Sequence, residues 1–326
     1  MKLIVPMAGY SPKLAPHTFN KSKALFEVAG KPILSHVLDR VKGLDFSEVI
    51  FVLDEHNPKL EKYLKSKYKF KFSFVLQKER RGVADAIHQA RGEFEKDEDV
   101  FILFVDTLIE ADFKDFKKGF HDGIIWTKKV DDPRRFGVVF HHENYISKLI
   151  EKPAVIDSNE AMVGMYYFRS WKVLHKAIKH IIDNDILNQG EYQLTDAMQI
   201  MINNGAKLLS REVKTWKDFG SLDSILEANS YLLKNNNIKS QTPTKCVIIK
   251  PVYIGEGCKI TNSVIGPHVS IGRDCTIEGC IIRNSIVGEE SRVTDANLNK
   301  SVIGAKNVVS ARGKSLNLGD LSLIDM

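Results

Sequence analysis

The residues best suited to bind an anion follow the first predicted strand. That strand, Lys2–Met7, runs into a loop that begins with Ala8 and Gly9, and Lys13 and Lys23 follow within the next segment. A loop after a buried strand can offer backbone N–H groups to an anion, and lysines add positive charge. Proline and glycine also mark ordinary turns, so this stretch alone is a weak indication of a phosphate site.

A carboxylate of the type that binds Mg²⁺ follows another predicted strand. Asp106 comes directly after the apolar run Val100–Val105, and carboxylate oxygens are ligands that Mg²⁺ accepts. An aspartate at a strand end more often forms a turn or caps a helix. Its position alone therefore favours a structural role.

These side chains depend on the secondary structure that would position them. Residues 1–232 alternate apolar runs, typical of buried strands, with amphipathic stretches, typical of helices. The expected strands are Lys2–Met7, Glu48–Leu53, Phe72–Gln77, Val100–Val105 and Ile146–Ile150, and the expected helices are Ile33–Val41, Pro58–Lys67, Val83–Ala90 and Leu222–Lys234. This order predicts an α/β fold with a mainly parallel sheet. Ligands bind beyond the C-terminal ends of such strands, so the residues after each strand are the candidates for a site.

A different pattern begins at Ile254. Pairs of an aliphatic residue and glycine recur, each with a second aliphatic residue five or six positions later: Ile254–Gly255, Ile265–Gly266, Ile271–Gly272, Val287–Gly288 and Ile303–Gly304. This hexapeptide repeat predicts a parallel β-helix whose aliphatic side chains point to the axis, with glycine permitting the corner conformation. A polar linker precedes it, so we expect two domains, residues 1–240 and 245–326. We interpret the second as a scaffold.

The composition excludes several classes of protein. Of the 326 residues, 43% are hydrophobic and 27% are charged, with a net charge of +6, as in an ordinary globular chain. The densest basic run, Lys59–Lys71, alternates with apolar residues, so we interpret it as a solvated helix end and expect no nucleic-acid partner. No apolar stretch suits a secretory signal or the roughly 18 residues of a membrane span. We therefore expect a cytoplasmic protein with no membrane partner.

All four cysteines lie in the repeat region, at Cys246, Cys258, Cys275 and Cys280. Their spacing matches no zinc or redox pattern. We expect free thiols that pack as small apolar groups.

An ordered set of motifs resembles the sugar-1-phosphate nucleotidylyltransferases, especially the glucose-1-phosphate thymidylyltransferase-like group. Along the chain these motifs are Lys21–Leu25 with Gly30–Leu34, Gln77 with Gly82–Ala86, Val105–Asp106, Phe136–Val139, Ile150–Pro153, Val163–Phe168, Gly190–Ala197 and Trp216–Ser221. The resemblance covers essentially the whole chain. It implies a Rossmann-like nucleotidyltransferase domain followed by a small left-handed parallel β-helix.

The resemblance also implies a reaction. A nucleoside triphosphate and a sugar 1-phosphate would be joined to a nucleotide sugar with release of pyrophosphate, in the presence of Mg²⁺. Two anions must approach each other in this reaction, so the protein has to position them and neutralise their charge. The implied metal ligands are Asp106 and Asp218, and the implied catalytic cations are Lys13, Lys23 and Lys152.

The same resemblance assigns binding positions. The nucleotide would be bound by Ala8, Gly9, Gln77 and Gly82, and the sugar phosphate by Gly137, Glu151, Lys152 and Gly164. The Gln77 amide could pair with a pyrimidine edge. The resemblance favours dTTP or UTP, and guanine or cytosine stays open because Gln77 alone does not decide the base. The run Gly190–Asp196 would shape the sugar pocket, although Thr195 or Asp196 could equally cap the following helix.

Two departures from the family pattern leave alternatives open. The loop residues Tyr10–Lys13 replace two glycines and a Thr-Arg pair, and Val105 replaces the glycine before the metal aspartate. The leading hypothesis is an active Mg-dependent transferase that forms a homo-oligomer through or beside the β-helix. The alternative is a regulatory or scaffold homologue that binds a nucleotide sugar and partners with an active paralogue. Acyltransferase activity of the β-helix is disfavoured, because His268 is its only histidine.

Overall fold

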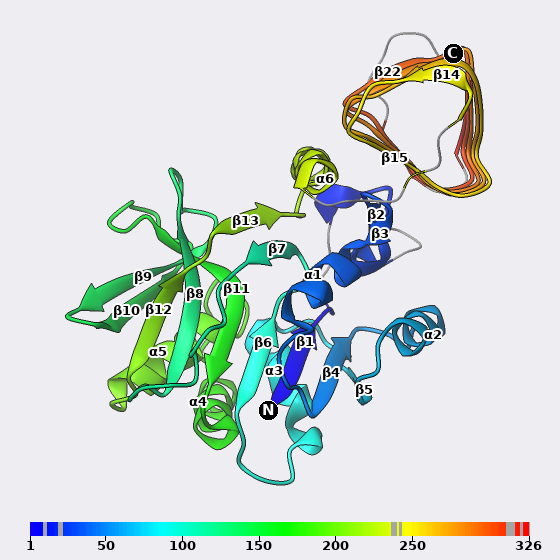
Figure 1. Cartoon of the computed structure of the whole chain (residues 1–326). Coiled ribbons are helices and arrows are strands. Elements are labelled where there is room, and N and C mark those ends of the chain that lie inside the picture. Colours follow the sequence, from blue (N-terminus) through cyan, green and yellow to red (C-terminus); the bar gives the residue numbers. More distant parts are fainter. Residues whose placement is uncertain are drawn as a thin grey trace. The chain divides into compact units, whose positions relative to one another are not determined.

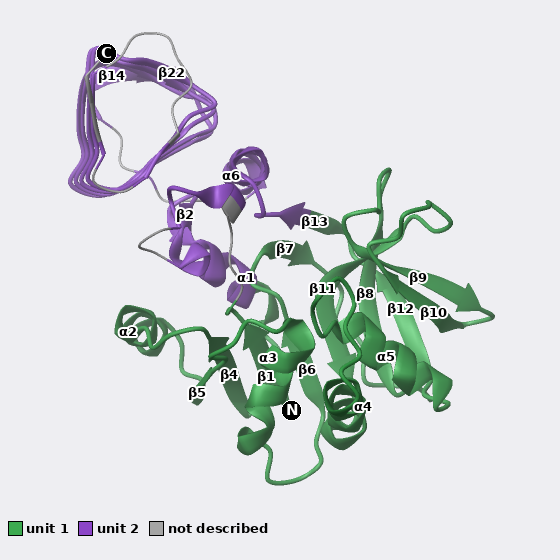
Figure 2. Ribbon diagram, turned by 180° about the vertical axis from the view of Figure 1, so that it is seen from behind, with its two compact units in different colours: residues 1–10, 40–216 green, residues 11–39, 217–326 purple. Residues whose placement is uncertain are grey.

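The computed structural model describes residues 1–8, 12–18, 22–235, 240, 243–310, 317–319 and 322–325. The chain forms two compact units, one of residues 1–10 and 40–216 and the other of residues 11–39 and 217–326 (Figure 2). The expected nucleotide-binding residue Gly9, and Tyr10 and Ser11 of the altered loop, lie outside the described residues. Since the units are divided by contacts and not by sequence order, the domain boundary expected near residue 240 stays a prediction.

The first unit is built on one mixed sheet in the order β10-β9-β11-β6-β1-β4-β5, and β8 joins β11 to β12. The bounds are β1 Lys2–Pro6, β4 Glu48–Leu53, β5 Phe72–Leu76, β6 Val100–Leu103, β8 Gly123–Lys129, β9 Gly137–His142, β10 Tyr145–Glu151, β11 Glu160–Phe168 and β12 Leu208–Glu212. Strands β6, β1, β4 and β5 run parallel, whereas β11 runs antiparallel to β6. The expected α/β fold is confirmed.

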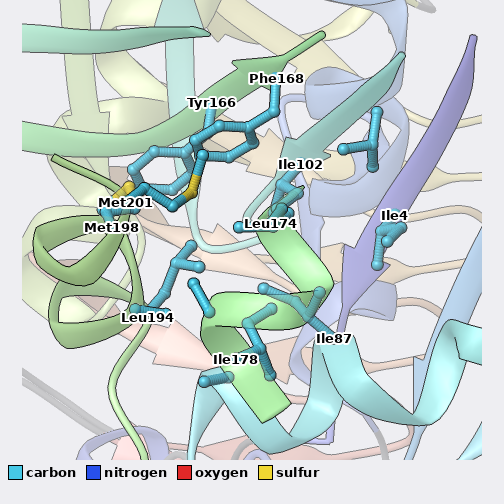
Figure 3. Close-up of a cluster of buried hydrophobic side chains, with 14 of the residues drawn as sticks. Ile4, Ile87, Ile102, Tyr166, Phe168, Leu174, Ile178, Leu194, Met198 and Met201 are labelled. Atoms are coloured by element: carbon cyan, nitrogen blue, oxygen red, sulfur yellow. The ribbon is translucent and has the colours of Figure 1, made fainter. Parts of the chain in front are cut away.

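Helices cover this sheet because its strands are apolar on both faces. The bounds are α2 Pro58–Lys67, α3 Val83–Gln89, α4 Trp171–Asp183 and α5 Leu194–Asn203. Figure 3 shows Ile4 of β1 and Ile102 of β6 facing a cluster that includes Ile87 of α3, Leu174 of α4 and Met198 of α5. This cluster is the core that holds α3, α4 and α5 against the sheet.

The predicted elements agree with the structure except at their ends. Helix α1 (Ile33–Val41), α2 and β4 have the predicted bounds. Strand β6 ends at Leu103 and not at Val105, although the next N–H, of Phe104, still bonds to Gly164 O on β11 at 2.8 Å, because the chain turns at Val105 and Asp106. Asp106 therefore lies on a turn that leads from β6 into β7 (Thr107–Glu110).

The second unit contains the predicted parallel β-helix, which Figure 1 shows end on as a triangular coil. Its strands are β14 Lys245–Ile248, β15 Val252–Ile254, β16 Lys259–Ile265, β17 Val269–Ile271, β18 Thr276–Glu278, β19 Ile281–Arg283, β20 Ile286–Val287, β21 Arg292–Thr294, β22 Asn297–Asn299, β23 Val302–Ile303, β24 Val308–Ser310, β25 Asn317–Leu318 and β26 Leu323–Asp325. Equivalent aliphatic residues stack in register from coil to coil, as in the column Ile254, Ile271, Val287, Ile303 and Leu318. This stacking buries the repeat that no single coil could bury alone.

Most glycines of the repeat have a different role from the one expected. Left-handed φ values in the coil occur at non-glycine residues such as Asp274, Glu290 and Lys306, at 56° to 59°. A Cβ on Gly272 would instead lie 2.5 Å from the backbone nitrogen of Glu289 in the next coil. The expected corner conformation is found at Gly266, whose φ is +111°, whereas Gly255, Gly272 and Gly288 are needed because adjacent coils approach closely.

Helix α6 (Leu222–Asn235) and the N-terminal segment belong to the same unit as the coil. The side chain of Asn229 on α6 is fully buried. Its Oδ1 accepts hydrogen bonds from Ala29 N–H at 3.0 Å and from Ser270 Oγ at 2.6 Å, and its Nδ2 donates to His268 O at 3.2 Å. One amide thus joins α6, the turn at Ala29 and strand β17.

The cysteines follow the prediction, since all four are free and three of them are buried in the coil. None of the helices in the described part of the chain is long and apolar enough to cross a membrane.

Candidate active site

A glycine, a carboxylate and a hydroxyl meet at the ends of two neighbouring strands in the first unit. Glu151, the last residue of β10, pairs in register with Gly137, the first residue of β9. A Cβ on Gly137 would overlap Met162 and would lie 2.9 Å from Glu151 Oε2 and 3.4 Å from Thr195 Oγ1. Only glycine leaves room for this arrangement, so Gly137 lets the Glu151 carboxylate lie against the backbone of β9.

Thr195 holds the Glu151 carboxylate in place. Its Oγ1 donates a hydrogen bond to Glu151 Oε2 at 2.6 Å. Burial raises the pKa of Glu151, and the Thr195 hydrogen bond and the charge of Lys152 partly offset this. The N-cap of α5 is Gln193, which makes no side-chain cap bond. Of the two roles left open for Thr195, the structure therefore places it at Glu151 and not at the helix cap.

Lys152 has an unusual backbone conformation. Its φ is +43°, in the left-handed region that lysine rarely occupies, and its N–H bonds to Phe136 O at 3.1 Å. Such a conformation costs on the order of 1 kcal/mol and tends to occur at functional sites. With this conformation the chain turns directly after Glu151, and the Lys152 side chain is exposed.

Gly164 lets the turn that carries Asp106 approach β11. Its φ is +82°, and a Cβ there would lie 2.8 Å from the ring of Phe104. The pairing of β11 with β8 shifts register between Met162 and Tyr166, around this glycine. Gly164 therefore leaves the space in which Phe104, at the start of the turn with Asp106, packs against β11.

The negative charges of Asp106 and Glu151 both affect the ionisation of Tyr166. Tyr166 on β11 is buried, and its pKa is raised by burial and by the negative charges of Glu151 and Asp106. Thr107, next to Asp106, accepts a hydrogen bond from the indole of Trp216, which packs edge-on against Phe136. The turn with Asp106 and the strand end with Glu151 thus both lie near Tyr166.

Asp218, the second expected metal ligand, lies in the second unit at the end of β13 (Thr215–Asp218). Gly220 N–H donates to its Oδ1 at 2.8 Å, and Ser224 Oγ donates to its Oδ2 at 3.2 Å. The sequence hypothesis did not include Ser224, whose only signal was its place in the first turn of α6. These donors orient the carboxylate.

A metal ion would find few protein ligands here. Among the residues that the structure describes, no three His, Cys, Asp or Glu side chains gather at a metal-binding spacing. Asp106 and Asp218 are hard oxygen donors, and Mg²⁺ in phosphate sites typically takes one or two carboxylates and completes its shell with water and substrate oxygens. Asp106 in the first unit and Asp218 in the second unit are each a carboxylate of this kind.

The expected base-reading residues lie together in the first unit. Gln77 follows β5, and its Nε2 donates to Gly82 O at 3.0 Å and to Asp85 Oδ2 at 2.8 Å. Gly82 has a φ of +110°, and a Cβ there would lie 2.6 Å from Tyr192 O. Gly82 is thus required by both its conformation and its contact with the 191–192 backbone. Asp85 was not among the expected site residues, although a carboxylate on the apolar side of a short helix was a signal for it.

The remaining expected residues lie in or after short elements. Ala8 is buried just beyond β1. Lys13 is exposed in a 3₁₀ turn, Pro12–Leu14, and Lys23 begins another, Lys23–Leu25. Both lysines belong to the second unit, whereas Lys152 belongs to the first.

Comparison with known proteins identifies the family. The family model described as nucleotidyl transferase matches residues 2–235. The chain belongs to the nucleotidyl transferase family. A model of the GlmU-like C-terminal hexapeptide domain matches residues 222–287, in agreement with the observed coil.

Relatives of this nucleotidyl transferase carry names from sugar metabolism. A glucose-1-phosphate thymidylyltransferase of Streptomyces antibioticus is 28% identical over 94% of this chain and 93% of its own length. The low-salt glycan biosynthesis nucleotidyltransferase Agl11 of Haloferax volcanii is 27% identical over the full length of both chains. A bifunctional GlmU protein of Methanocaldococcus jannaschii is 33% identical over 79% of this chain and 61% of its own length.

A solved structure shares the fold. It is a Bacillus anthracis chain assigned as a glucose-1-phosphate thymidylyltransferase, determined in complex with sucrose. It superposes with a TM-score of 0.62 at 23% identity, over 73% of this nucleotidyl transferase and 97% of the other chain.

Proposed function

We propose that the protein joins a nucleoside triphosphate, dTTP or UTP, to a hexose 1-phosphate and releases pyrophosphate. The observation that carries this proposal is the cluster at the strand ends in which Thr195 fixes Glu151 beside Gly137. A partly buried carboxylate with one oxygen bound by a hydroxyl keeps acceptor capacity for sugar hydroxyls. The names of the thymidylyltransferase relatives support the substrate class.

The chemistry requires positioning more than covalent participation. An oxygen of the sugar phosphate attacks the α-phosphorus, a new P–O bond forms, and the bond to the β-phosphate oxygen breaks as pyrophosphate leaves in line. Lys152, directly after Glu151, would hold the sugar phosphate, and Lys13 and Lys23 would bind the triphosphate. Mg²⁺ held by Asp106 and Asp218 would neutralise phosphate charge when it is bound.

The test is a pyrophosphate-release assay over a matrix of nucleoside triphosphates and hexose 1-phosphates with Mg²⁺. We expect turnover with at least one pair, and a loss of about 100-fold or more in kcat in Asp106→Asn, because charge neutralisation contributes several kcal/mol. Lys114→Gln, an exposed lysine of the same unit outside the site, is the matched control and keeps its rate. Folded protein that turns over no pair refutes the proposal.

The altered loop, residues 10–13, favours a regulatory homologue as the second candidate function. Lys13 replaces the arginine of the family pattern and cannot make its bidentate fork to phosphate. A regulatory homologue would bind nucleotide sugar by calorimetry and release no pyrophosphate in the same matrix. That pair of results would replace the catalytic proposal with the regulatory one.

We also propose that the protein is a cytoplasmic homo-oligomer that associates through the outer face of the coil. Val247, Val264 and Ile281 lie side by side on that face in register. Val247 is 58% exposed and Ile281 is 41% exposed, and contiguous exposed aliphatic groups are typical of protein interfaces. Light scattering of the wild type and of Val247→Lys tests this, and a monomeric wild type refutes it.

A further inference from the structure

The amide of Gln77 is held in one orientation by two acceptors. Its side chain is 4% exposed, and both hydrogens of Nε2 are used, one by Gly82 O and one by Asp85 Oδ2. Among the residues that the structure describes, none donates a hydrogen bond to Oε1 of Gln77.

The reverse orientation is excluded by chemistry. A carboxylate and a backbone carbonyl only accept hydrogen bonds. Turning the amide by 180° would place Oε1 against the oxygens of Asp85 and Gly82 and lose two hydrogen bonds in a buried site, each costing about 1–3 kcal/mol. Oε1 is therefore the atom that Gln77 can offer to a ligand.

Asp85 is itself held firmly. It is 1% exposed on the first turn of α3, and its other oxygen, Oδ1, accepts from Arg81 Nη2 at 2.7 Å and from Gln89 Nε2 at 3.1 Å. The hydrogen bond that Arg81 donates to Asp85 is also the largest cause of the raised pKa of Arg81. With Oδ1 occupied by these donors, Oδ2 stays directed at Gln77.

We propose that Asp85 is a specificity-determining positioning residue, which sets Gln77 to accept a hydrogen bond from the nucleotide base. Uracil and thymine present a ring N–H at N3 and satisfy this acceptor. Cytosine presents an unprotonated N3 and places two acceptors against each other. An unpaired buried acceptor is the feature by which sites reject an analogue most strongly.

This inference rests on the proposed function, so its test compares bases on one protein. The kcat/KM is measured with UTP, dTTP, CTP, GTP and N3-methyl-UTP, which lacks the N–H. We expect UTP or dTTP to exceed CTP and N3-methyl-UTP by about 100-fold, from loss of one oriented hydrogen bond and a buried acceptor. GTP also offers a ring N–H, and a preference for GTP overturns the assignment to a pyrimidine.

The variant Asp85→Asn tests the positioning. Its amide can donate to Oε1 of Gln77, so only the Gly82 carbonyl still opposes a turn of the Gln77 amide that would present its NH₂ group to the base. We expect the UTP:CTP ratio to fall at least 10-fold. Because the ratio is taken on one variant, a general loss of folded protein cancels. Glu79→Gln makes the same change of carboxylate to amide on an exposed neighbour of Arg81 and leaves the ratio unchanged.

Binding of the same nucleotides, measured by calorimetry, separates the proposed function from the role of Asp85. Selective UTP or dTTP binding without pyrophosphate release refutes the proposed function, and a loss of that selectivity in Asp85→Asn then supports the role of Asp85. Equal use of UTP and N3-methyl-UTP, or an unchanged ratio in Asp85→Asn, overturns the role of Asp85 and leaves the proposed function standing.

Discussion

Thr195 donates a hydrogen bond from Oγ1 to Oε2 of Glu151 over 2.6 Å, across 44 residues of sequence. Hydrogen bonds to a charged group contribute about 1.5–3 kcal/mol. In Thr195→Val, which keeps the shape and removes the hydroxyl, we expect kcat/KM for the sugar 1-phosphate to fall about 10- to 100-fold. Thr195→Ser keeps the donor and should keep most of the activity. Equal activity of the valine and serine variants would show that the hydroxyl does not act through Glu151.

Gly82 is a backbone position where any side chain is strained. Its φ is +110°, and an added Cβ would meet Tyr192 O at 2.6 Å. We expect Gly82→Ala to lower the free energy of unfolding by about 2 kcal/mol or more. Gly92 has nothing within 4 Å of its Cβ position, so Gly92→Ala is the control and should unfold like the wild type in urea. A stable Gly82→Ala variant would contradict the packing of α3 on residues 191–192.

Glu48 makes the stability of the first unit depend on pH. Burial alone would raise the pKa of Glu48, but hydrogen bonds from Lys2, Ser73 and Lys71 outweigh burial and hold that pKa at about 2. Since the folded pKa lies below the unfolded value of 4.5, the stabilisation is complete above about pH 5 and is lost as the pH falls toward 2.

The stabilisation from the lowered pKa of Glu48 is on the order of 3 kcal/mol at neutral pH. Urea denaturation of the wild type and of Glu48→Gln should therefore differ most at pH 7 and converge near pH 2. Glu212→Gln, an exposed partner of Lys128, should stay within about 1 kcal/mol at every pH. A Glu48→Gln effect that does not change with pH would exclude this ionisation as its cause.

Asn229 connects three backbone or side-chain groups of the second unit. Removing it in Asn229→Ala leaves Ala29 N–H, the Ser270 hydroxyl and His268 C=O without that partner. With about 1–3 kcal/mol for each buried group left unpaired, we expect the melting of the second unit to fall by several degrees in calorimetry. Asn235→Ala removes one exposed hydrogen bond to Tyr231 O on the same helix and should melt within about 1 °C of the wild type.

Patterns among neighbouring residues were sufficient to predict most of the strands and helices that the sequence analysis named. The apolar run of β4 and the amphipathic pattern of α2, with Asn57 accepting from Leu60 N–H and Pro58 at the first turn, depend on neighbours along the chain. The aliphatic period of the coil is also local, and it predicted the β-helix. The end of β6 at Leu103 was not predictable, because the apolar run continues to Val105 while the chain already turns at Val105 and Asp106.

Some residues of the candidate site could also be predicted from the sequence, whereas their contacts could not. Motif order alone pointed to Asp106, Glu151, Lys152 and Gln77 as site residues, and these roles stay predictions. Thr195 and Asp85 lie within two of these motifs, but the hydrogen bond of Thr195 to Glu151 and that of Gln77 to Asp85 did not follow from motif order, because each depends on which side chain the fold brings opposite it.

By itself, the sequence determined the α/β unit, the β-helix and the family, since hydrophobic period and motif order are properties of the chain read along its length. Tertiary structure alone decided that Thr195 orients Glu151, that the coil glycines serve close stacking and that Asp85 sets the direction of the Gln77 amide. The physical reason is that hydrogen-bond direction and close approach are relations between atoms in space. Residues distant in sequence acquire them only when packing brings their strands and helices together.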